Sequence, residues 1–289
     1  MPDDFARHTV EREGAAGKAW LDAVPDLVSG LVREWELTIR AKPMAGTVGL
    51  VWEVSRSDRS AAVLKVGWQD VWSCNEAAAL REWAGNGAAR LLESDDVSGS
   101  MLLERLCPQR SLVAEPLEEA VCTAAAVANR LHVLSSRGFA GVLDQDDEDG
   151  RSSGKYDAEI AHVRPAVEEA ITALPSVLLH GDLHYENILW SGREWKAIDP
   201  KPASGPAEWD YIPLLRNRFA EYDHSDLLRD IRRRLDRVTE AAGGSRREAY
   251  LFVQFRALLD ADYAHRIKDE AFEHLSSALV AATQATGEW

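Results

Sequence analysis

The sequence is poor in cysteine and lacks both a long apolar run and a signal-like start. Its three cysteines, Cys74, Cys107 and Cys122, show no metal-ligand spacing, which favours a reducing cytoplasm. The first residues contain no basic segment followed by an apolar one, so no secretory signal is expected. The apolar runs are too short to cross a bilayer. We therefore expect a cytoplasmic protein that has no membrane partner.

Basic residues are also scarce relative to acidic ones. The chain has 33 Lys and Arg against 48 Asp and Glu, a formal net charge of −15 and a pI near 5.0. Such a surface repels nucleic acid phosphates and attracts cationic ligands, although acidity also simply aids solubility. We therefore expect no nucleic acid partner. The length of 289 residues and the apolar fraction of 46% suit one large domain or two lobes with a sizeable core.

Two short apolar runs each end in a group of polar residues. Val177–Leu179 leads to Asp182 and Asn187, and a second run leads to Asp199 one hairpin later. Phosphoryl transfer needs a carboxylate that orients a hydroxyl and accepts its proton, and hard oxygen ligands for Mg²⁺. Asp182 suits the first task, and Asn187 and Asp199 suit the second. Either group alone could be a polar turn after a strand, but both in this order indicate phosphoryl transfer.

This arrangement resembles the catalytic core of the aminoglycoside phosphotransferases, which are antibiotic kinases with a protein-kinase-like fold. The resemblance implies an α+β, two-lobe fold. Residues 1–105 would form a small N-lobe with an antiparallel nucleotide-binding sheet and N-terminal helices. Residues 106–289 would form a larger, mostly helical C-lobe with the catalytic loop, the metal site and the substrate pocket. The implied cofactors are ATP, with GTP left open, and Mg²⁺.

The resemblance also implies nucleotide contacts in the N-lobe. Lys65 lies in the strand-like run 61–66 and would hold the α- and β-phosphates, with Glu76 as its partner in preference to Glu82. A hairpin that comprises Gly46, Thr47, Val48 and Gly49 would cover the phosphates. A plain hairpin turn is the alternative. An interlobe hinge would bind the adenine edge through backbone groups, and it comprises Glu104, Arg105 and Leu106.

Other residues are expected to bind the acceptor or support the loop. Carboxylates beside an aromatic face suit cationic groups, and the candidates are Glu208, Trp209 and Asp147 of the acidic run 144–149. The alternatives are that Trp209 belongs to the core and that the run is a solvated loop. His180 and His184 are expected to be hydrogen-bonded loop supports. The resemblance gives Asp210 the task of bonding the catalytic-loop backbone.

Four further segments resemble the streptomycin and hydroxyurea phosphotransferase branch of that family, namely residues 20–28, 33–37, 197–201 and 205–217. The implied function is ATP-dependent phosphorylation of a hydroxyl on a small cationic antibiotic, aminoglycoside-like or peptide, which confers antibiotic resistance. One alternative is a metabolic kinase of the same superfamily, for choline, homoserine or a fructosamine. Another is a pseudokinase binding module, against which the presence of all four residues Lys65, Asp182, Asn187 and Asp199 argues. The oligomeric state stays open.

Apolar spacing predicts the secondary structure around these motifs. Strands are expected at residues 37–40, 49–54 and 61–66. Helices are expected at 17–35, with a possible break at Pro25, at 116–137, with Gly138 as the C-cap, and at 158–174, 223–242, 246–268 and 270–286.

Overall fold

The computed structural model describes residues 1–69, 74–135, 137–146 and 152–284. The chain forms two compact units, residues 1–107 and residues 108–289. Among the described residues, none of the helices combines the length and the apolar character that crossing a membrane requires.

The first unit begins with a long helix, α1 (Asp3–Glu34). The helix is kinked at Gly14, whose φ of 62° is accessible to glycine at little cost. The possible break at Pro25 was a wrong prediction, because Pro25 lies inside the helix. Apolar side chains on both sides of it, including Val24 and Val28, are buried in one cluster, and this packing keeps the helix continuous.

A six-stranded antiparallel sheet follows α1 in the described part of this unit. Its order is β1-β3-β4-β6-β5, with β2 also paired to β3. The strands are β1 (Thr38–Ile39), β2 (Met44–Ala45), β3 (Gly49–Ser55), β4 (Ala61–Gly67), β5 (Leu91–Asp95) and β6 (Ser100–Glu104). In β4 the side chains of Leu64 and Val66 are buried in the cluster that contains the α1 residues. Because side chains alternate along a strand, Lys65 lies on the opposite face.

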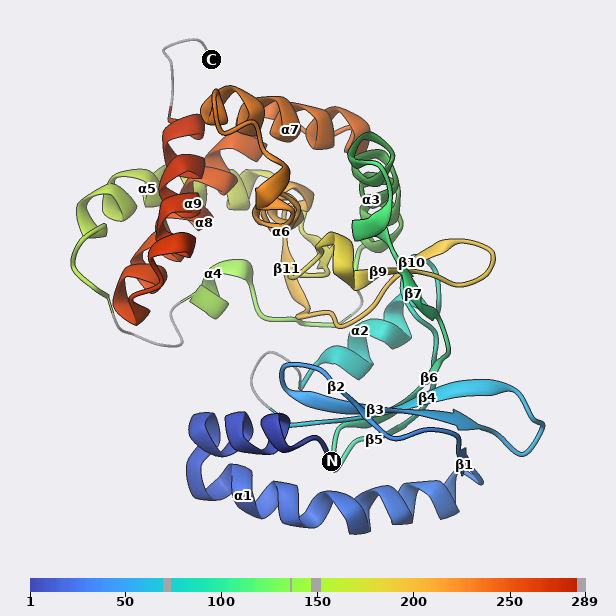
Figure 1. Ribbon diagram of the computed structural model, residues 1–289. Helices are drawn as coiled ribbons and strands as arrows, with labels where there is room; N and C mark the ends of the chain where they lie inside the picture. Colours follow the sequence, from blue (N-terminus) through green and yellow to red (C-terminus); the bar gives the residue numbers. More distant parts are fainter. Residues whose placement is uncertain (70–73, 136, 147–151, 285–289) are drawn as a thin grey trace. The chain divides into compact units, whose positions relative to one another are not determined.

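The helix α2 (Glu76–Trp83) covers that opposite face, so α1 and α2 enclose the sheet (Figure 1). Glu76 opens α2 and reaches Lys65 from there. The alternation of β4 and the position of α2 together bring a lysine and a glutamate into contact on one side of the sheet.

The second unit is mostly helical. Its helices are α3 (Leu117–Leu131), α4 (Val142–Asp146), α5 (Asp157–Ala173), α6 (Ile212–Arg216), α7 (Leu227–Ala242), α8 (Arg246–Ile267) and α9 (Glu270–Thr283). α8 is the central one and packs against α5, α7 and α9, while α3 packs against α7. Its buried face includes Phe252, Phe255 and Leu258.

One helix of this unit ends earlier than the sequence suggested. α3 stops at Leu131, with His132 at its C-cap, and Gly138 does not cap it. The chain leaves the helix because Val133 uses its carbonyl group to accept a hydrogen bond from the Leu178 N–H. The side chain of His132 is held at the same time by Asp210.

Two small sheets present the loops of interest. One consists of β7 (Cys107–Ser111), β9 (Ile188–Trp190) and β10 (Trp195–Ala197), in the order β10-β9-β7. Its strand β7 starts at the last residue of the first unit. The other pairs β8 (Val177–Leu179) with β11 (Ala203–Gly205). Ile188 pairs with Ala197 in the β9–β10 hairpin, and the Ile198 N–H donates to the Asn187 carbonyl at 2.9 Å. This register brings the segments around Asn187 and Asp199 side by side.

Candidate active site

The loop between β8 and β9 depends on a glycine. Gly181 has a φ of 78°, and a Cβ atom at this position would lie 2.0 Å from the Lys201 carbonyl oxygen. The Lys201 N–H also donates to the His180 carbonyl at 2.8 Å. Only a residue without a side chain allows the two segments to approach this closely. The loop that carries Asp182 is therefore packed directly against the segment that follows Asp199.

Asp210 anchors the same loop through hydrogen bonds to its backbone. Its side chain is fully buried, and its Oδ1 accepts the Gly181 N–H at 2.8 Å. Its Oδ2 accepts the His180 N–H at 2.9 Å and lies 3.0 Å from Nε2 of His132. Burial raises the pKa of this carboxyl, but the hydrogen bond and charge of His132 and the contacts with His180 outweigh burial and lower it. The hydrogen bonds to the loop backbone expected for Asp210 are therefore present.

His180 supports the loop as a neutral ring. Its side chain is fully buried, and burial lowers its pKa more than the nearby carboxylates raise it. Nδ1 accepts the Asp182 N–H at 3.3 Å, which places the ring proton on Nε2, 2.9 Å from the Ile198 carbonyl. The expected role of His180 as a hydrogen-bonded support agrees with these contacts. The ring joins the loop to the end of the β9–β10 hairpin.

Asp182 forms an ion pair with Lys201. The Lys201 Nζ lies 2.8 Å from Asp182 Oδ2, and 24% of the Asp182 side chain is exposed. Burial raises the pKa of Asp182, but the charge and hydrogen bond of Lys201, with smaller contributions from His184 and His180, outweigh it and lower the pKa. Asp182 is thus an ionised, partly exposed carboxylate that can accept a proton.

Asn187 and Asp199 offer the oxygen atoms expected for a metal site. The Asn187 Nδ2 donates to the Asp182 carbonyl at 3.0 Å, which uses the amide donor and leaves Oδ1 as an acceptor. Asp199 is exposed and has a φ of 55°, which is uncommon outside glycine. Among the described residues, no cluster of three or more His, Cys, Asp or Glu side chains could hold a metal ion. The donor set fits Mg²⁺, which needs few protein ligands when phosphate oxygens and waters complete its shell.

In the first unit, Lys65 and Glu76 form the expected ion pair. The Lys65 Nζ lies 2.7 Å from both carboxylate oxygens of Glu76, and the side chains are 13% and 4% exposed. The structure thereby selects Glu76 as the partner of Lys65, as the sequence suggested. The contact of Lys65 with phosphates remains a prediction.

The glycine-containing segment forms a tight hairpin turn between β2 and β3. The Gly46 N–H donates to the Gly49 carbonyl at 2.8 Å, and the Val48 carbonyl accepts the Trp68 N–H at 2.8 Å. The Thr47 carbonyl accepts a hydrogen bond from Arg12 of α1. Both alternatives for Gly46–Gly49, a plain turn and a phosphate-covering hairpin, are compatible with this geometry.

The proposed hinge residues begin at Glu104, the last residue of β6. The Glu104 carboxylate accepts the Arg90 N–H at 2.7 Å, and Arg105 pairs with Glu53 at 2.9 Å. Leu106 is buried. These side chains are occupied within the first unit, which agrees with a role for the backbone rather than the side chains. Adenine binding by this segment remains a prediction.

Glu208 and Trp209 have packing roles. The Glu208 Oε1 accepts the Ser245 N–H at 3.0 Å, and Trp209 is only 5% exposed. The Trp209 ring packs against Phe252 and Phe255 with centroid distances of 5.5 and 6.3 Å. The core alternative for Trp209 therefore agrees with the structure, and acceptor binding by these two residues remains untested. Asp147 lies outside the described residues.

Two residues of the site were given no role by the sequence. His132 binds Asp210, and its only sequence signal is its place at the end of an apolar helical pattern. Lys201 binds Asp182, and its signal is the Asp-Pro-Lys sequence that starts at Asp199.

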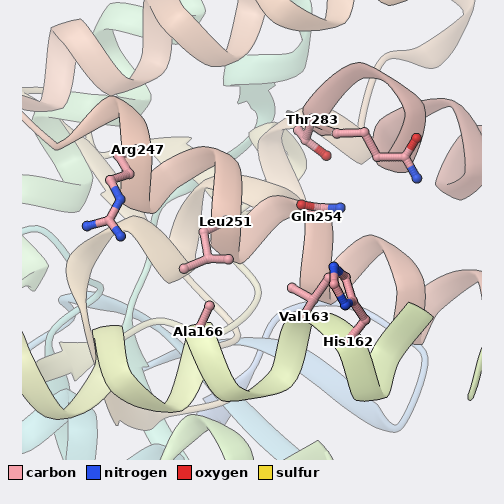
Figure 2. A pocket seen from close by; sticks show the side chains of 8 residues that line it. His162, Val163, Ala166, Arg247, Leu251, Gln254 and Thr283 are labelled. Atoms are coloured by element: carbon pink, nitrogen blue, oxygen red, sulfur yellow. The ribbon is translucent and has the colours of Figure 1, made fainter. Parts of the chain in front are cut away.

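The second unit also has a cavity of about 460 Å³ that is separate from these loops (Figure 2). It lies among α5, α8 and the end of α9. Its lining residues are His162, Val163, Ala166, Arg247, Leu251, Gln254, Thr283 and Gln284. None of the site residues expected from the sequence belongs to this lining.

Comparison with known proteins identifies relatives over most of the chain. The family model described as aminoglycoside/hydroxyurea antibiotic resistance kinase matches residues 34–267. A streptomycin 6-kinase from Streptomyces glaucescens is 34% identical over 275 residues, 90% of this chain and 89% of the relative. A hydroxyurea phosphotransferase from Kitasatospora aureofaciens is 34% identical over 233 residues, 76% of this chain and 68% of the relative.

Solved structures share the fold at much lower identity. The crystal structure of choline kinase LicA from Streptococcus pneumoniae has a TM-score of 0.62 and 10% identity, covering 89% of this chain and 98% of that chain. At this identity the likeness shows the fold alone. It confirms the expected kinase-like α+β fold.

Proposed function

Because the chain belongs to the aminoglycoside/hydroxyurea antibiotic resistance kinase family, we propose that it phosphorylates a hydroxyl group of a small cationic antibiotic and thereby inactivates it. Family membership makes the chain a kinase, so the proposal concerns its acceptor, its cofactor and its residues. The observation that carries it is the ionised Asp182 carboxylate in a loop whose backbone Asp210 holds.

The chemistry assigned to Asp182 is proton acceptance. The acceptor oxygen forms a bond to the γ-phosphorus of ATP while its proton passes to the Asp182 carboxylate. The bond between the γ-phosphorus and the β–γ bridging oxygen breaks, and its electron pair leaves with ADP. Asp210 and His180 keep the Asp182 backbone in place, so that the carboxylate meets the hydroxyl in a fixed orientation.

The remaining site residues handle the nucleotide. Lys65, held by Glu76, binds the α- and β-phosphates. Asn187 and Asp199 would hold Mg²⁺, which would supply positive charge to the phosphate oxygens. The turn at residues 46–49 and the backbone at 104–106 cover the phosphates and the adenine. In this proposal residues 1–105 act as the nucleotide-binding lobe, and residues 106–289 bind the metal and the acceptor.

Two observations support a cationic antibiotic as the acceptor. The net charge of −15 attracts cations over a range of about 10 Å at 0.1 M salt. The name of the Streptomyces glaucescens relative assigns it streptomycin, a hydroxyl-rich cationic drug. The three cysteines Cys74, Cys107 and Cys122 form no disulfide in the described part of the chain, which supports a reducing cytoplasm where ATP is available.

An acceptor screen tests this function. The wild-type protein is incubated with ATP and Mg²⁺ and with streptomycin, hydroxyurea or choline, and each compound is examined by mass spectrometry for one added phosphoryl group. We expect the addition on streptomycin, and an addition on choline alone would replace the antibiotic assignment with a metabolic one.

The Asp182→Ala variant tests the proton acceptor in the same assay. Turnover should fall by roughly 10²–10⁴-fold, as is typical when general-base assistance is lost. ATP binding should persist, because Asp182 is not assigned to the nucleotide. The matched control is Asp223→Ala, since Asp223 is an exposed carboxylate of the same unit that bonds only its local turn. Normal turnover in Asp182→Ala would remove this role from Asp182.

A further inference from the structure

Lys201 occupies a well-defined place beside the proposed base. Its backbone N–H donates to the His180 carbonyl, and its own carbonyl oxygen lies where a side chain on Gly181 would be. The backbone of Lys201 is therefore fixed against the loop that carries Asp182. The side chain extends from this fixed point to Asp182 Oδ2 at 2.8 Å.

The Lys201 ammonium group has binding capacity beyond this ion pair. An ammonium group carries three N–H donors, and Asp182 is the carboxylate with which Lys201 pairs in the described part of the chain. The Lys201 side chain is 51% exposed, so it is accessible to a ligand. In the described part of the chain, smaller effects on Asp182 come from His184 and from His180, which is buried and neutral. Among the described residues, Lys201 is therefore the permanent cation that pairs with this carboxylate.

The proposed reaction creates a need for such a charge. An ionised Asp182 must accept a proton from a hydroxyl while that hydroxyl bonds a phosphoryl group that is itself negative. Like charges at close range repel strongly where water is partly excluded. A cation that contacts both groups removes this repulsion and stabilises the charge that spreads over the phosphoryl oxygens.

We propose that Lys201 is a catalytic residue whose ammonium group bridges Asp182 Oδ2 and an oxygen of the transferring phosphoryl group. This inference rests on the proposed function and adds a residue to its mechanism. The acceptor proton passes to Asp182, the new O–P bond forms, and the electron pair of the broken P–O bond leaves with ADP. Lys201 keeps its proton throughout and holds Asp182 Oδ2, which leaves Oδ1 for the acceptor hydroxyl.

The test compares Lys201→Met and Lys201→Arg with a matched control. The control is Lys155→Met, because Lys155 is 49% exposed and pairs with Glu273 at 2.6 Å in the same unit. For each variant kcat and the KM values are measured in the acceptor assay. Independently of turnover, the dissociation constants of ADP and of the non-hydrolysable triphosphate AMP-PNP are measured by calorimetry with Mg²⁺ present.

A bridging lysine predicts a distinct set of results. Lys201→Met should lower kcat by about 10²-fold, the effect of removing one preorganised donor from a transition state. It should weaken AMP-PNP binding about tenfold while ADP binding stays within about twofold, because only the triphosphate carries the group that Lys201 contacts. Lys201→Arg should recover part of both losses, and Lys155→Met should behave as wild type.

Three results would overturn the proposal. They are a kcat of Lys201→Met within threefold of wild type, an equal loss of ADP and AMP-PNP binding, and a Lys201→Arg variant no better than Lys201→Met. If Lys201→Met loses its cooperative thermal transition, Lys201→Gln is measured instead. Loss of folding in both neutral variants would make Lys201 structural and also end the proposal. If the wild type phosphorylates none of the tested acceptors, the proposed function fails, while the nucleotide comparison still decides the role of Lys201.

Discussion

Replacing Asp210 with asparagine tests how much this buried carboxylate contributes to the stability of the protein and to the position of the loop that carries Asp182. The Asp210 carboxylate accepts the Gly181 N–H on Oδ1 and the His180 N–H on Oδ2. An asparagine amide has one acceptor oxygen. Whichever way it is oriented, its NH₂ group faces one of these two backbone donors and leaves it unpaired.

The expected loss of stability follows from this count. One buried donor without a partner costs about 1–3 kcal/mol, and the retained bonds weaken from charge-assisted to neutral ones by about 1 kcal/mol each. Relief of the buried charge offsets part of this sum. We therefore expect Asp210→Asn to lower the free energy of unfolding by about 2–4 kcal/mol. Displacement of Asp182 in the loosened loop should also lower kcat by about 10²-fold.

Urea unfolding followed by tryptophan fluorescence at pH 7, together with kcat, measures both effects. The chain has ten tryptophans, including the buried Trp209 of this unit. The control is Asp223→Asn, which removes a charge from an exposed turn and should change stability by less than about 0.5 kcal/mol.

The pH dependence gives a second measurement on the same variant. The pKa of Asp210 is lower in the folded protein than its usual value of 3.8. Its contribution to stability is therefore fully present above pH 3.8 and is lost as the pH falls through the folded pKa. The stability difference between wild type and Asp210→Asn should shrink below pH 3.8. A difference under 1 kcal/mol at pH 7 with unchanged kcat would refute the reasoning.

Two further predictions concern the nucleotide and the metal. Asp199→Asn replaces a charged oxygen ligand with a neutral one, so its activity should need more Mg²⁺ and should partly recover as Mg²⁺ is raised; an unchanged Mg²⁺ titration curve would show that Asp199 is not a ligand. Glu76→Gln removes the charge that holds Lys65, so the KM for ATP should rise about tenfold while the KM for the acceptor stays nearly constant. Equal changes in both KM values would argue against a specific role of this ion pair at the phosphates.

Several features could be predicted from the sequence because their signals are local. The resemblance to kinases paired Lys65, which lies in a strand-like run, with Glu76, and this ion pair is present. The short distance along the chain from Asp182 to Asn187 allows one loop to hold both residues. The order of the three polar residues Asp182, Asn187 and Asp199 is also typical of phosphoryl transfer, and few other functions would require it.

Local signals were less reliable where packing competes with them. A proline normally interrupts a helix, yet buried side chains on both sides of Pro25 keep α1 helical at this position. The kink in α1 lies instead at Gly14. The helix before the catalytic strand ends at Leu131, well before Gly138, because the following residues bond the strand at Leu178. In both cases a tertiary contact outweighed a propensity.

The sequence by itself indicated the family and the kinase-like fold and predicted the residues of the proposed catalytic loop, since spacing and residue chemistry are properties of the chain. The anchoring of that loop by Asp210 was expected, but only the tertiary structure decided which side chains pair with Asp210 and with Asp182. His132 contacts Asp210, which lies 78 residues further along the chain. Lys201 pairs with Asp182 where the absence of a side chain on Gly181 lets the two backbone segments approach closely. Such contacts depend on which segments pack together, and a helix end or a surface lysine looks the same in the sequence whether or not it has a distant partner.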